Sequence, residues 1–318
     1  MPTVPPTRTD RPPRRRPVRV STMAQGLVGS EILAIAADIR ERMAKGAEIC
    51  NLTVGDFSPE QFSIPVPLRT GIEAALAQGR TNYPPSSGIP ELREAVSRLF
   101  ARRLGLHYPV GSVLVAAGAR PLIYGAYRAV VDPGDRVVFP VPSWNNNHYA
   151  HMLGADAVPV SFGPESRFLP TAEGLSRVLP GARLVCINSP LNPTGTAISP
   201  EGLRAICEQI VEENQARAVS GQRPLYLLYD QVYWMLRVPG VEHVTPPGLV
   251  PQMADYTIFV DGISKAFAAT GLRVGWGVGP ADVMERMGAI LGHVGAWAPR
   301  PEQHASAALL DDDPAIDA

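Results

Sequence analysis

Short apolar runs alternate with amphipathic helical patterns along most of the chain, and this alternation limits the possible folds more than any other feature. Strands that alternate with helices predict a mostly parallel sheet with helices packed around it. We therefore expect an α/β fold. The strand candidates lie near residues 113–117, 136–140, 183–187, 225–229, 257–261 and 273–278. The helical patterns lie near residues 31–40, 66–79, 90–104, 121–131, 200–219 and 281–292, with Ser30 as the cap of the first.

Polar clusters follow several of these strand candidates directly. The run 184–187 is followed by Asn188 to Gly195, the run 225–228 by Tyr229 to Tyr233, and the run 113–117 by Gly118-Ala119-Arg120. In open α/β sheets, ligands bind at the carboxyl ends of the strands. We expect these clusters to share one edge of the sheet.

Lys265 follows the apolar strand candidate 257–261 and precedes Arg273 by eight residues. A lysine at a strand end is by itself more often a solvated side chain. An amine that traps a carbonyl must be neutral, which burial or neighbouring cations favour. Ser264 and Arg273 supply the donors that a phosphate group requires. Together with the polar clusters, these residues point to pyridoxal 5'-phosphate (PLP), a cofactor with an aldehyde and a phosphate.

The chain resembles the class I/II aminotransferases of PLP fold type I, the group of aspartate and aromatic aminotransferases. The resemblance extends from about Gly26 to about Leu310, and the order of the motifs is specific where single motifs are weak. The motifs are Asn51-Leu52-Thr53-Val54-Gly55, Tyr83-Pro84-Pro85-Ser86-Ser87-Gly88, Gly118-Ala119-Arg120, Trp144, Asn192-Pro193-Thr194-Gly195, Asp230 with Tyr233, Ser264-Lys265 and Arg273.

The resemblance implies three catalytic residues: Lys265, Asp230 and Tyr233. Asp230 would face the pyridine nitrogen and keep it protonated, so that the ring accepts electrons from the substrate. Asn192 and Tyr233 would bond the ring hydroxyl. Lys265 would hold the cofactor covalently and later move a proton between the substrate and the cofactor. Taken alone, Asp230 could instead cap a helix, Asn192 could serve a turn, and Tyr233 could pack in the core.

The remaining cofactor contacts implied by the resemblance concern the phosphate and the face of the ring. The phosphate would meet the helix start at Gly118, Ala119 and Arg120, together with Ser264 and Arg273. Trp144 would stack on the ring, although an isolated tryptophan is more often a core aromatic.

Two further residues are assigned through the resemblance. Tyr83 would cross a dimer interface to the neighbour's phosphate, which implies a homodimer, and Gly55 would meet the substrate carboxylate. Taken alone, Tyr83-Pro84-Pro85 also fits a rigid surface turn, and Gly55 fits an ordinary loop.

Charge and composition exclude several other classes. A formal net charge of −1 gives no strong field for nucleic acid or an anionic membrane. No apolar run reaches the ~18 residues of a membrane span. The only cysteines, Cys50, Cys186 and Cys207, show no metal-site or disulfide spacing, so we expect a cytoplasmic protein.

Two other motifs carry little weight. His148 and His151 are spaced for one helix face, but a surface pair is expected rather than a metal site, and no metal is predicted. The glycines of 275–279 lack the spacing of a dinucleotide-binding loop and lie inside a strand candidate.

We expect four segments along the chain. Residues 1–22 are a disordered basic tail rich in proline and arginine, 23–60 an N-terminal arm with part of a small domain, 61–295 the PLP-binding large domain, and 296–318 the start of a C-terminal segment. The acidic run 311–313 is expected to be solvated. Members of the resembled family continue for roughly another hundred residues, on the scale of a small domain, and carry there an arginine for the substrate carboxylate. We therefore expect an incomplete small domain, in a chain that is a fragment, a truncated gene product or a departure with an unusual carboxylate partner.

The predicted function is exchange of an amino group between an amino acid and a 2-oxo acid. Two alternatives remain open from the sequence. One is a truncated or non-catalytic PLP-binding fragment, and the other is a different PLP enzyme on the same scaffold, such as a β-lyase, because substrate contacts decide which bond at the α-carbon is broken.

Overall fold

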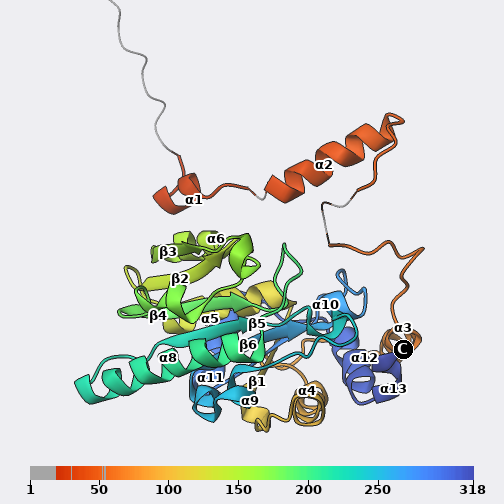
Figure 1. The fold of residues 1–318 in the computed structure, drawn as a ribbon. Coiled ribbons are helices and arrows are strands. Elements are labelled where there is room, and N and C mark those ends of the chain that lie inside the picture. Colours follow the sequence, from red (N-terminus) through yellow and green to blue (C-terminus); the bar gives the residue numbers. More distant parts are fainter. Residues whose placement is uncertain (1–18, 30, 52, 54) are drawn as a thin grey trace, which may run out of the picture.

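A seven-stranded sheet forms the centre of the computed structural model, which describes residues 19–29, 31–51, 53 and 55–318 (Figure 1). The strand order is β1-β7-β6-β5-β4-β2-β3. Strand β7 is antiparallel to both of its neighbours and the other pairs are parallel, which confirms the predicted α/β class with a mostly parallel sheet. The strands are β1 (Val113–Ala116), β2 (Arg136–Val141), β3 (Asp156–Ser161), β4 (Ala182–Asn188), β5 (Tyr226–Asp230), β6 (Thr257–Gly262) and β7 (Gly275–Val278).

Helices cover both faces of this sheet. The longer helices are α2 (Glu31–Ala44), α3 (Val66–Ala77), α4 (Pro90–Leu104), α5 (Ala119–Val130), α6 (Asn146–Leu153), α8 (Pro200–Ser220), α11 (Ala281–His293) and α12 (Arg300–Leu310). Short helices are α1 (Thr22–Gly26), α7 (Ala172–Ser176), α9 (Pro246–Leu249), α10 (Ile263–Ala266) and α13 (Asp313–Asp317), with 3-10 turns at Val110–Ser112, Pro164–Ser166, Trp234–Leu236 and Pro251–Asp255.

The alternation of side chains along each strand divides the core into two layers. On β6, Ile258 and Val260 belong to one buried cluster, which α5, α6 and α11 complete. Phe259 belongs to the other cluster, which receives side chains from α3, α4, α8 and α12. Because successive strand residues point to opposite faces, the central strands are buried on both sides and read as continuous apolar runs.

The register of β4, β5 and β6 aligns their carboxyl ends. Asn188 pairs with Asp230, and Asp230 pairs with Val260. The three strands therefore end side by side at one edge of the sheet, and the residues that follow them come close together.

The sequence located the central elements but missed parts of the edge. Strand β3 and helix α6 were not predicted, because β3 begins with a charged residue, contains Pro159 and alternates only weakly. The predicted strand 273–278 begins two residues later, at Gly275, since Arg273 has a φ of 56° that no strand accommodates. Helix α5 starts at Ala119 rather than at residue 121.

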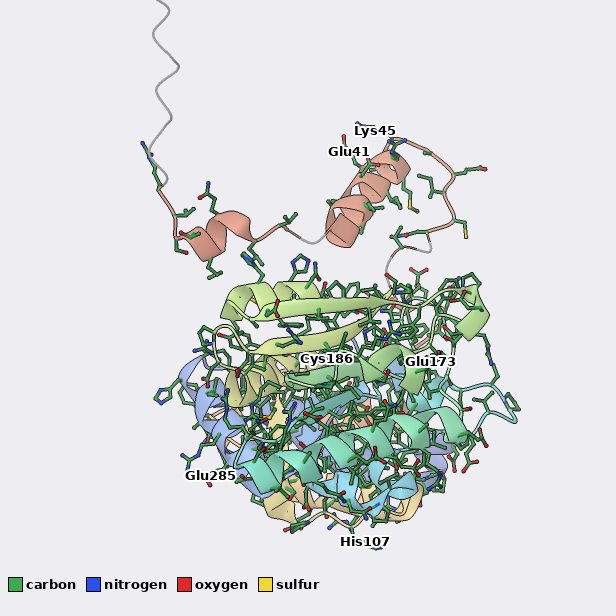
Figure 2. The ribbon with its side chains drawn as sticks, turned by 60° about the vertical axis from the view of Figure 1, so that its left-hand side comes forward. Glu41, Lys45, His107, Glu173, Cys186 and Glu285 are labelled. Atoms are coloured by element: carbon green, nitrogen blue, oxygen red, sulfur yellow. The ribbon has the colours of Figure 1, made fainter. Side chains whose placement is uncertain are left out.

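In the N-terminal part of the chain, α2 lies apart from these layers, whereas Met23 of α1 and Gly55 contact them. Helix α2 stands clear of the sheet and its covering helices in two views (Figures 1 and 2), and its Glu41–Lys45 ion pair lies on this separate helix. The predicted cap Ser30 and residues 1–18 of the predicted tail lie outside the described residues. The described end of that tail contains Ser21, which caps α1. The proposed domain boundaries remain a prediction.

Within the described ranges, no helix is both long and apolar enough to cross a membrane.

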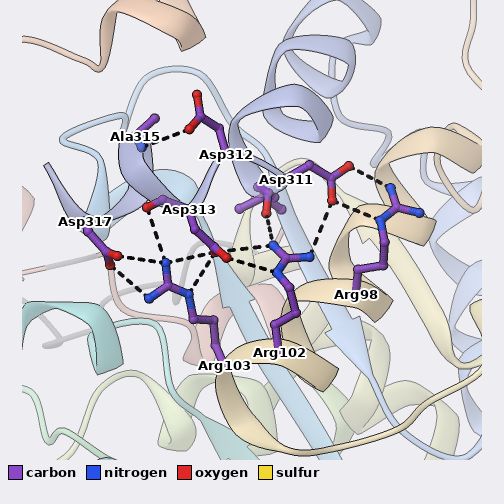
Figure 3. Close-up of polar contacts among 9 residues, drawn as sticks. Arg98, Arg102, Arg103, Asp311, Asp312, Asp313, Ala315 and Asp317 are labelled. Carbon is purple, nitrogen blue, oxygen red and sulfur yellow. Dashed lines mark hydrogen bonds and ion pairs between the residues drawn. The ribbon is translucent and has the colours of Figure 1, made fainter.

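The acidic run at the end of the chain is largely exposed, as expected, but two of its three aspartates also form ion pairs that were not predicted. Arg98 of α4 binds Asp311 with both of its forked nitrogens, at 3.0 and 2.7 Å (Figure 3). Arg103 binds Asp313 and Asp317, each at 2.9 Å. Helix α13 is thereby attached to α4 through charge pairs that a sequence pattern cannot reveal, because the partners are about two hundred residues apart.

We predict that Asp311→Asn lowers the free energy of unfolding by up to about 1 kcal/mol, the range measured for exposed ion pairs. The hydrogen bond from Arg98 lowers the pKa of Asp311. A folded-state pKa below the unfolded value of about 3.9 stabilises the fold above that pH, and the gain is lost as the pH falls through the folded pKa. Chemical denaturation at pH 7 and at pH 2.5 should therefore show a difference between the two proteins only at pH 7.

Asp312→Asn is the matched control for this experiment. Asp312 accepts a hydrogen bond from the Ala315 amide at the start of α13, a role that asparagine fills equally well. An equal loss of stability from both substitutions would contradict the importance of the Arg98 pair.

Candidate active site

Most of the predicted site residues gather at the edge of the sheet where the parallel strands end and β7 begins. This edge follows from the topology, since an antiparallel β7 starts where β1 and β6 finish. The residues are Gly118 after β1, Trp144 after β2, Asn192 after β4, Asp230 at the end of β5, Lys265 after β6 and Arg273 before β7.

Lys265 lies on α10, one turn after β6. Its amine donates a hydrogen bond of 2.5 Å to the carbonyl oxygen of Gly55. Burial lowers the pKa of Lys265; the carboxylate of Asp56 opposes this, and the guanidinium groups of Arg120 and Arg273 lower the pKa further. A lysine with this environment has a larger neutral fraction and is a better nucleophile.

The segment around Gly55 covers the amine from the N-terminal side. Thr270 donates a hydrogen bond to Asp56, and Gly55 accepts from Lys265, so both residues contact the loop that carries the lysine. A Cβ at residue 55 would lie 3.5 Å from the Lys265 amine, an ordinary contact. The backbone of Gly55 thus lies beside the nucleophile, where the sequence placed a substrate-contacting residue.

Asp230 is a largely buried carboxylate at the end of β5. It accepts a hydrogen bond of 3.2 Å from the Val232 amide, and burial raises its pKa to about 6. Among the described residues, no ion pair is formed by this carboxylate. A buried carboxylate without a cation is stabilised by any positively charged group that binds beside it.

A chain of amide hydrogen bonds connects Asp230 to Tyr233 through the end of β4. Asn188 donates to the Asp230 carbonyl at 2.8 Å and accepts from the Asn192 amide at 2.7 Å. The Asn192 side chain donates to the Tyr233 hydroxyl at 3.1 Å. The predicted pair Asn192 and Tyr233 is therefore in direct contact. Asn188, at the end of β4, fixes the position of the Asn192 backbone.

Gly118 and Arg273 form a tight cradle at the start of α5. A Cβ at residue 118 would lie 2.4 Å from an Arg273 nitrogen, and Gly118 has a φ of 91°, so only glycine fits. Arg273 donates to the carbonyl oxygens of Ala117 and Thr270 at 3.1 and 2.7 Å. Helix α5 has no side-chain cap, so its first amides and the Arg273 fork together suit an anion.

Three other predicted residues surround this cradle. Ser264 is buried and precedes Lys265 on α10. Ala119 and Arg120 form the first turn of α5, and the guanidinium of Arg120 lies 5.3 Å from the centre of the Trp144 ring. Such an approach is a cation–π contact, which fixes the tryptophan beside the site.

Tyr83, the residue predicted to cross a dimer interface, lies in the loop between α3 and α4. Its side chain is 81% exposed, and its ring packs edge-on against Trp297 at 5.2 Å. The exposure leaves the hydroxyl accessible to another molecule.

Several residues at the site were missed from the sequence. Tyr149 of α6 is buried within charge range of Arg120 and Asp230, and burial raises its pKa to about 12. Asp56 approaches Lys265, and its place next to Gly55 was the only signal. Asp261 and Gln231 are also buried next to predicted site residues, and no motif singled them out.

The described residues contain no group of three or more His, Cys, Asp or Glu side chains that could hold a metal ion. His148 and His151 do share helix α6, and the His151 ring is bonded to the Met23 carbonyl at 2.8 Å.

Comparison with known proteins gives a consistent result. The family model described as aminotransferase class I and II matches residues 47–318. The chain is 35% identical to a probable aspartate/prephenate aminotransferase of Thermus aquaticus over 84% of its length, and 33% identical to the aspartate/prephenate aminotransferase of Thermus thermophilus over 85%. It spans 66% of the length of each of these relatives.

Solved structures agree with the sequence comparison. The aspartate aminotransferase of Thermus thermophilus with maleate superposes with a TM-score of 0.85 at 31% identity, covering 93% of this chain and 74% of that one. The enzyme of Rhizobium meliloti gives a TM-score of 0.85 at 30% identity, with coverage of 93% and 71%.

We predict that two charge substitutions shift the pKa of Lys265 in opposite directions. Asp56→Asn removes the negative charge that raises this pKa and should lower it, whereas Arg120→Gln removes a positive charge and should raise it. The measurement is the pH dependence of amine labelling by trinitrobenzenesulfonate, located by mass spectrometry.

The chain has only two lysines, and Lys45 is exposed directly after helix α2, which stands clear of the sheet. Lys45 is therefore an internal control in every sample, and its labelling profile should stay constant. Shifts of the same sign in both variants would show that the neighbouring charges do not control Lys265.

Proposed function

The chain belongs to the aminotransferase class I and II family, and from this membership and the geometry of the site we propose that it is a PLP-dependent aminotransferase. It would exchange an amino group between an amino acid and a 2-oxo acid. The observation that carries the proposal is that a lysine of lowered pKa, an arginine cradle and a buried carboxylate converge at one edge of the sheet.

The residues at this edge fit PLP in both shape and charge. The anion cradle of Gly118, Ala119, Arg273 and Ser264 suits the phosphate, and it would be blocked by a side chain at residue 118. The buried Asp230 lacks a cation and suits a protonated pyridine nitrogen. A site that is positive at one end and negative at the other matches a cofactor with the opposite polarity.

When bound, PLP supplies an electron sink that stabilises the charge left on the substrate α-carbon. Asp230 would keep the ring nitrogen protonated. Burial raises the pKa of Asp230, so its charged form is stabilised by a positively charged group such as this nitrogen. Asn192 and Tyr233, which already bond each other, would orient the ring through its hydroxyl. Trp144, held by Arg120, would cover one face of the ring.

Lys265 has two proposed roles. Its neutral amine would hold the cofactor through the aldehyde, and burial together with Arg120 and Arg273 favours that neutral form. The same amine would also be the acid–base group that accepts the proton of the substrate α-carbon. The Gly55 carbonyl, 2.5 Å from the amine, would orient the Lys265 side chain during this transfer.

The proposed substrates follow from the relatives. Two of these are aspartate/prephenate aminotransferases, and one solved relative is described with maleate, a four-carbon dicarboxylate like aspartate. Aspartate is therefore the amino donor to assay first, with 2-oxoglutarate as acceptor. The backbone of Gly55 would lie near the substrate carboxylate.

We also propose a homodimer with composite active sites. The support is Tyr83, whose ring is 81% exposed and packs edge-on against Trp297, so that its hydroxyl is open to another molecule. Its hydroxyl would reach the phosphate of the neighbouring subunit.

The test of the whole proposal is transamination by the purified chain supplied with PLP, followed as oxaloacetate production from aspartate and 2-oxoglutarate. Turnover that depends on PLP supports the function. Covalent PLP binding to Lys265 without any turnover, across a panel of amino acids and 2-oxo acids, would reject it.

We predict that Lys265→Ala and Lys265→Arg both abolish covalent capture of PLP. The wild-type protein should show an absorption band in the visible or near-ultraviolet, as expected of a cofactor bound to an amine. Borohydride should abolish the band and leave the cofactor attached to Lys265. Arginine retains the positive charge but not the nucleophile, so it separates the two roles, and Lys45 again serves as the internal control. A borohydride-stable adduct in either variant would refute the assignment.

We predict that Asp230→Asn lowers kcat far more than it weakens PLP binding. The arginine cradle supplies much of the affinity, whereas Asp230 acts on the ring nitrogen, so the loss in kcat should reach about a hundredfold or more, as for other single electrostatic contacts. The dissociation constant for PLP should rise only severalfold. Asp312→Asn makes the same chemical change far from the site and should leave both quantities unchanged. Losses of equal size in kcat and affinity would indicate a structural role.

A further inference from the structure

Asp261 is a buried carboxylate that the proposed chemistry does not use. It lies on β6 next to Val260, on the face of the sheet opposite to that of Asp230, and its side chain is 2% exposed. Burial raises its pKa to about 7, against the opposing effect of its hydrogen bonds. A group that is this costly to bury requires well-placed partners.

Three hydrogen-bond donors meet this carboxylate. The Trp234 indole donates to one oxygen at 2.7 Å, and the Gln231 amide donates to the same oxygen at 3.2 Å. The Gly262 amide donates to the other oxygen at 2.7 Å. In the described part of the chain no cation pairs with Asp261, so these neutral donors are its support.

Each donor is a close neighbour in sequence of a site residue. Gln231 follows Asp230, and Trp234 follows Tyr233. Gly262 is the N-cap of α10, the helix of Lys265. Asp261 thus ties the loop after β5 to the loop after β6, and these two loops carry the three proposed catalytic residues.

A second contact fixes the orientation of Gln231. Since its amide nitrogen donates to Asp261, its oxygen faces the His243 ring nitrogen at 3.2 Å. Burial lowers the pKa of His243 to about 4, so the neutral ring donates one N–H to Gln231. The ring also packs on Trp234 with 5.5 Å between the centres. His243 therefore contacts both side chains that donate to Asp261 and fixes their positions.

We propose that Asp261 is a positioning residue, which sets the distance between Lys265 and the Asp230–Tyr233 pair by accepting hydrogen bonds from both loops. The inference rests on the proposed function for its catalytic consequence, but its structural content concerns the cofactor-free protein. A residue on one face of the sheet would thus fix the positions of catalytic residues on the other face.

The chemistry of the carboxylate gives a graded set of variants. Asp261→Leu keeps a similar volume but removes both acceptors, so the buried N–H groups of Trp234 and Gln231 lose their partner. Asp261→Asn keeps one carbonyl oxygen, which can still accept from Trp234 and Gln231, and loses only the local hydrogen bond from the adjacent Gly262 amide, because the new NH2 group cannot accept it. If these hydrogen bonds position Lys265, the leucine variant should change the reactivity of Lys265 strongly and the asparagine variant should change it little.

The first measurement is the PLP concentration that gives half-maximal borohydride-stable labelling of Lys265. We expect an increase of about tenfold or more for Asp261→Leu, the loss of roughly one buried hydrogen bond, and less than about threefold for Asp261→Asn. The second is the pH midpoint of Lys265 labelling by trinitrobenzenesulfonate without PLP, which should shift in the leucine variant and stay close to wild type in the asparagine variant. Lys45 controls for reagent access in both.

Phe259→Leu is the control for general destabilisation. Phe259 lies on the same strand, fully buried, and contacts no proposed site residue through a polar group. It should lower the melting temperature without moving either Lys265 measurement. If Asp261→Leu does not fold, Trp234→Phe is the substitute, because phenylalanine keeps the packing and removes one hydrogen-bond donor. The PLP concentration for half-maximal labelling of Lys265 should then rise by only about threefold.

Two results would overturn the proposal. One is a loss of melting temperature in Asp261→Leu, or in Trp234→Phe where that variant is used, with both Lys265 measurements unchanged. The other is an asparagine variant as impaired as the leucine variant. Failure of the aminotransferase proposal is distinguishable, because wild-type protein would then lack turnover while the labelling midpoint of Lys265 still responded to Asp261.

Discussion

Close approach of three backbones makes the site possible. Gly262 at the end of β6 pairs with Gly275 at the start of β7, and Gly275 lies against Gly118 after β1. A Cβ at Gly275 would come within 2.7 Å of the Gly118 backbone, and one at Gly262 within 2.8 Å of the Val274 carbonyl oxygen. Any side chain at these positions would separate the strands. Because the strands meet here, the amine of Lys265, the fork of Arg273 and the first amides of α5 share one edge.

The electrostatics of the site follow from this convergence. Arg120 and Arg273 come close enough to Lys265 to lower its pKa, while Asp230, two strands away from β7, is buried without a cation. The two charged regions remain separate because β5 and β6 end in step and direct their polar residues into different loops. The separation of charge across one sheet edge gives the site a polarity before any ligand binds.

The sequence was sufficient for the parts of the molecule in which local pattern and burial agree. The central strands are buried on both faces and read as continuous apolar runs, so their positions and the class of sheet were predictable. Lys265, Asp230 and Arg273 were identifiable because each lies within a few residues of such a strand. Strand β3 and helix α6 were not, since β3 is an edge strand with partly exposed side chains and α6 begins with two asparagines.

Contacts between distant segments explain the remaining misses. The aspartates after α12 were predicted only to be solvated, whereas Asp311 and Asp313 also pair with arginines of α4. No local pattern encodes a pair separated by more than two hundred residues. Asp261 is a similar case, because a single carboxylate in an apolar strand resembles an imperfection of the pattern. Its importance becomes visible only when Trp234 and Gln231 are seen to converge on it from the neighbouring loop. Buried polar residues within strand candidates are therefore the positions at which sequence patterns and tertiary structure differ most, and here they lie directly behind the site.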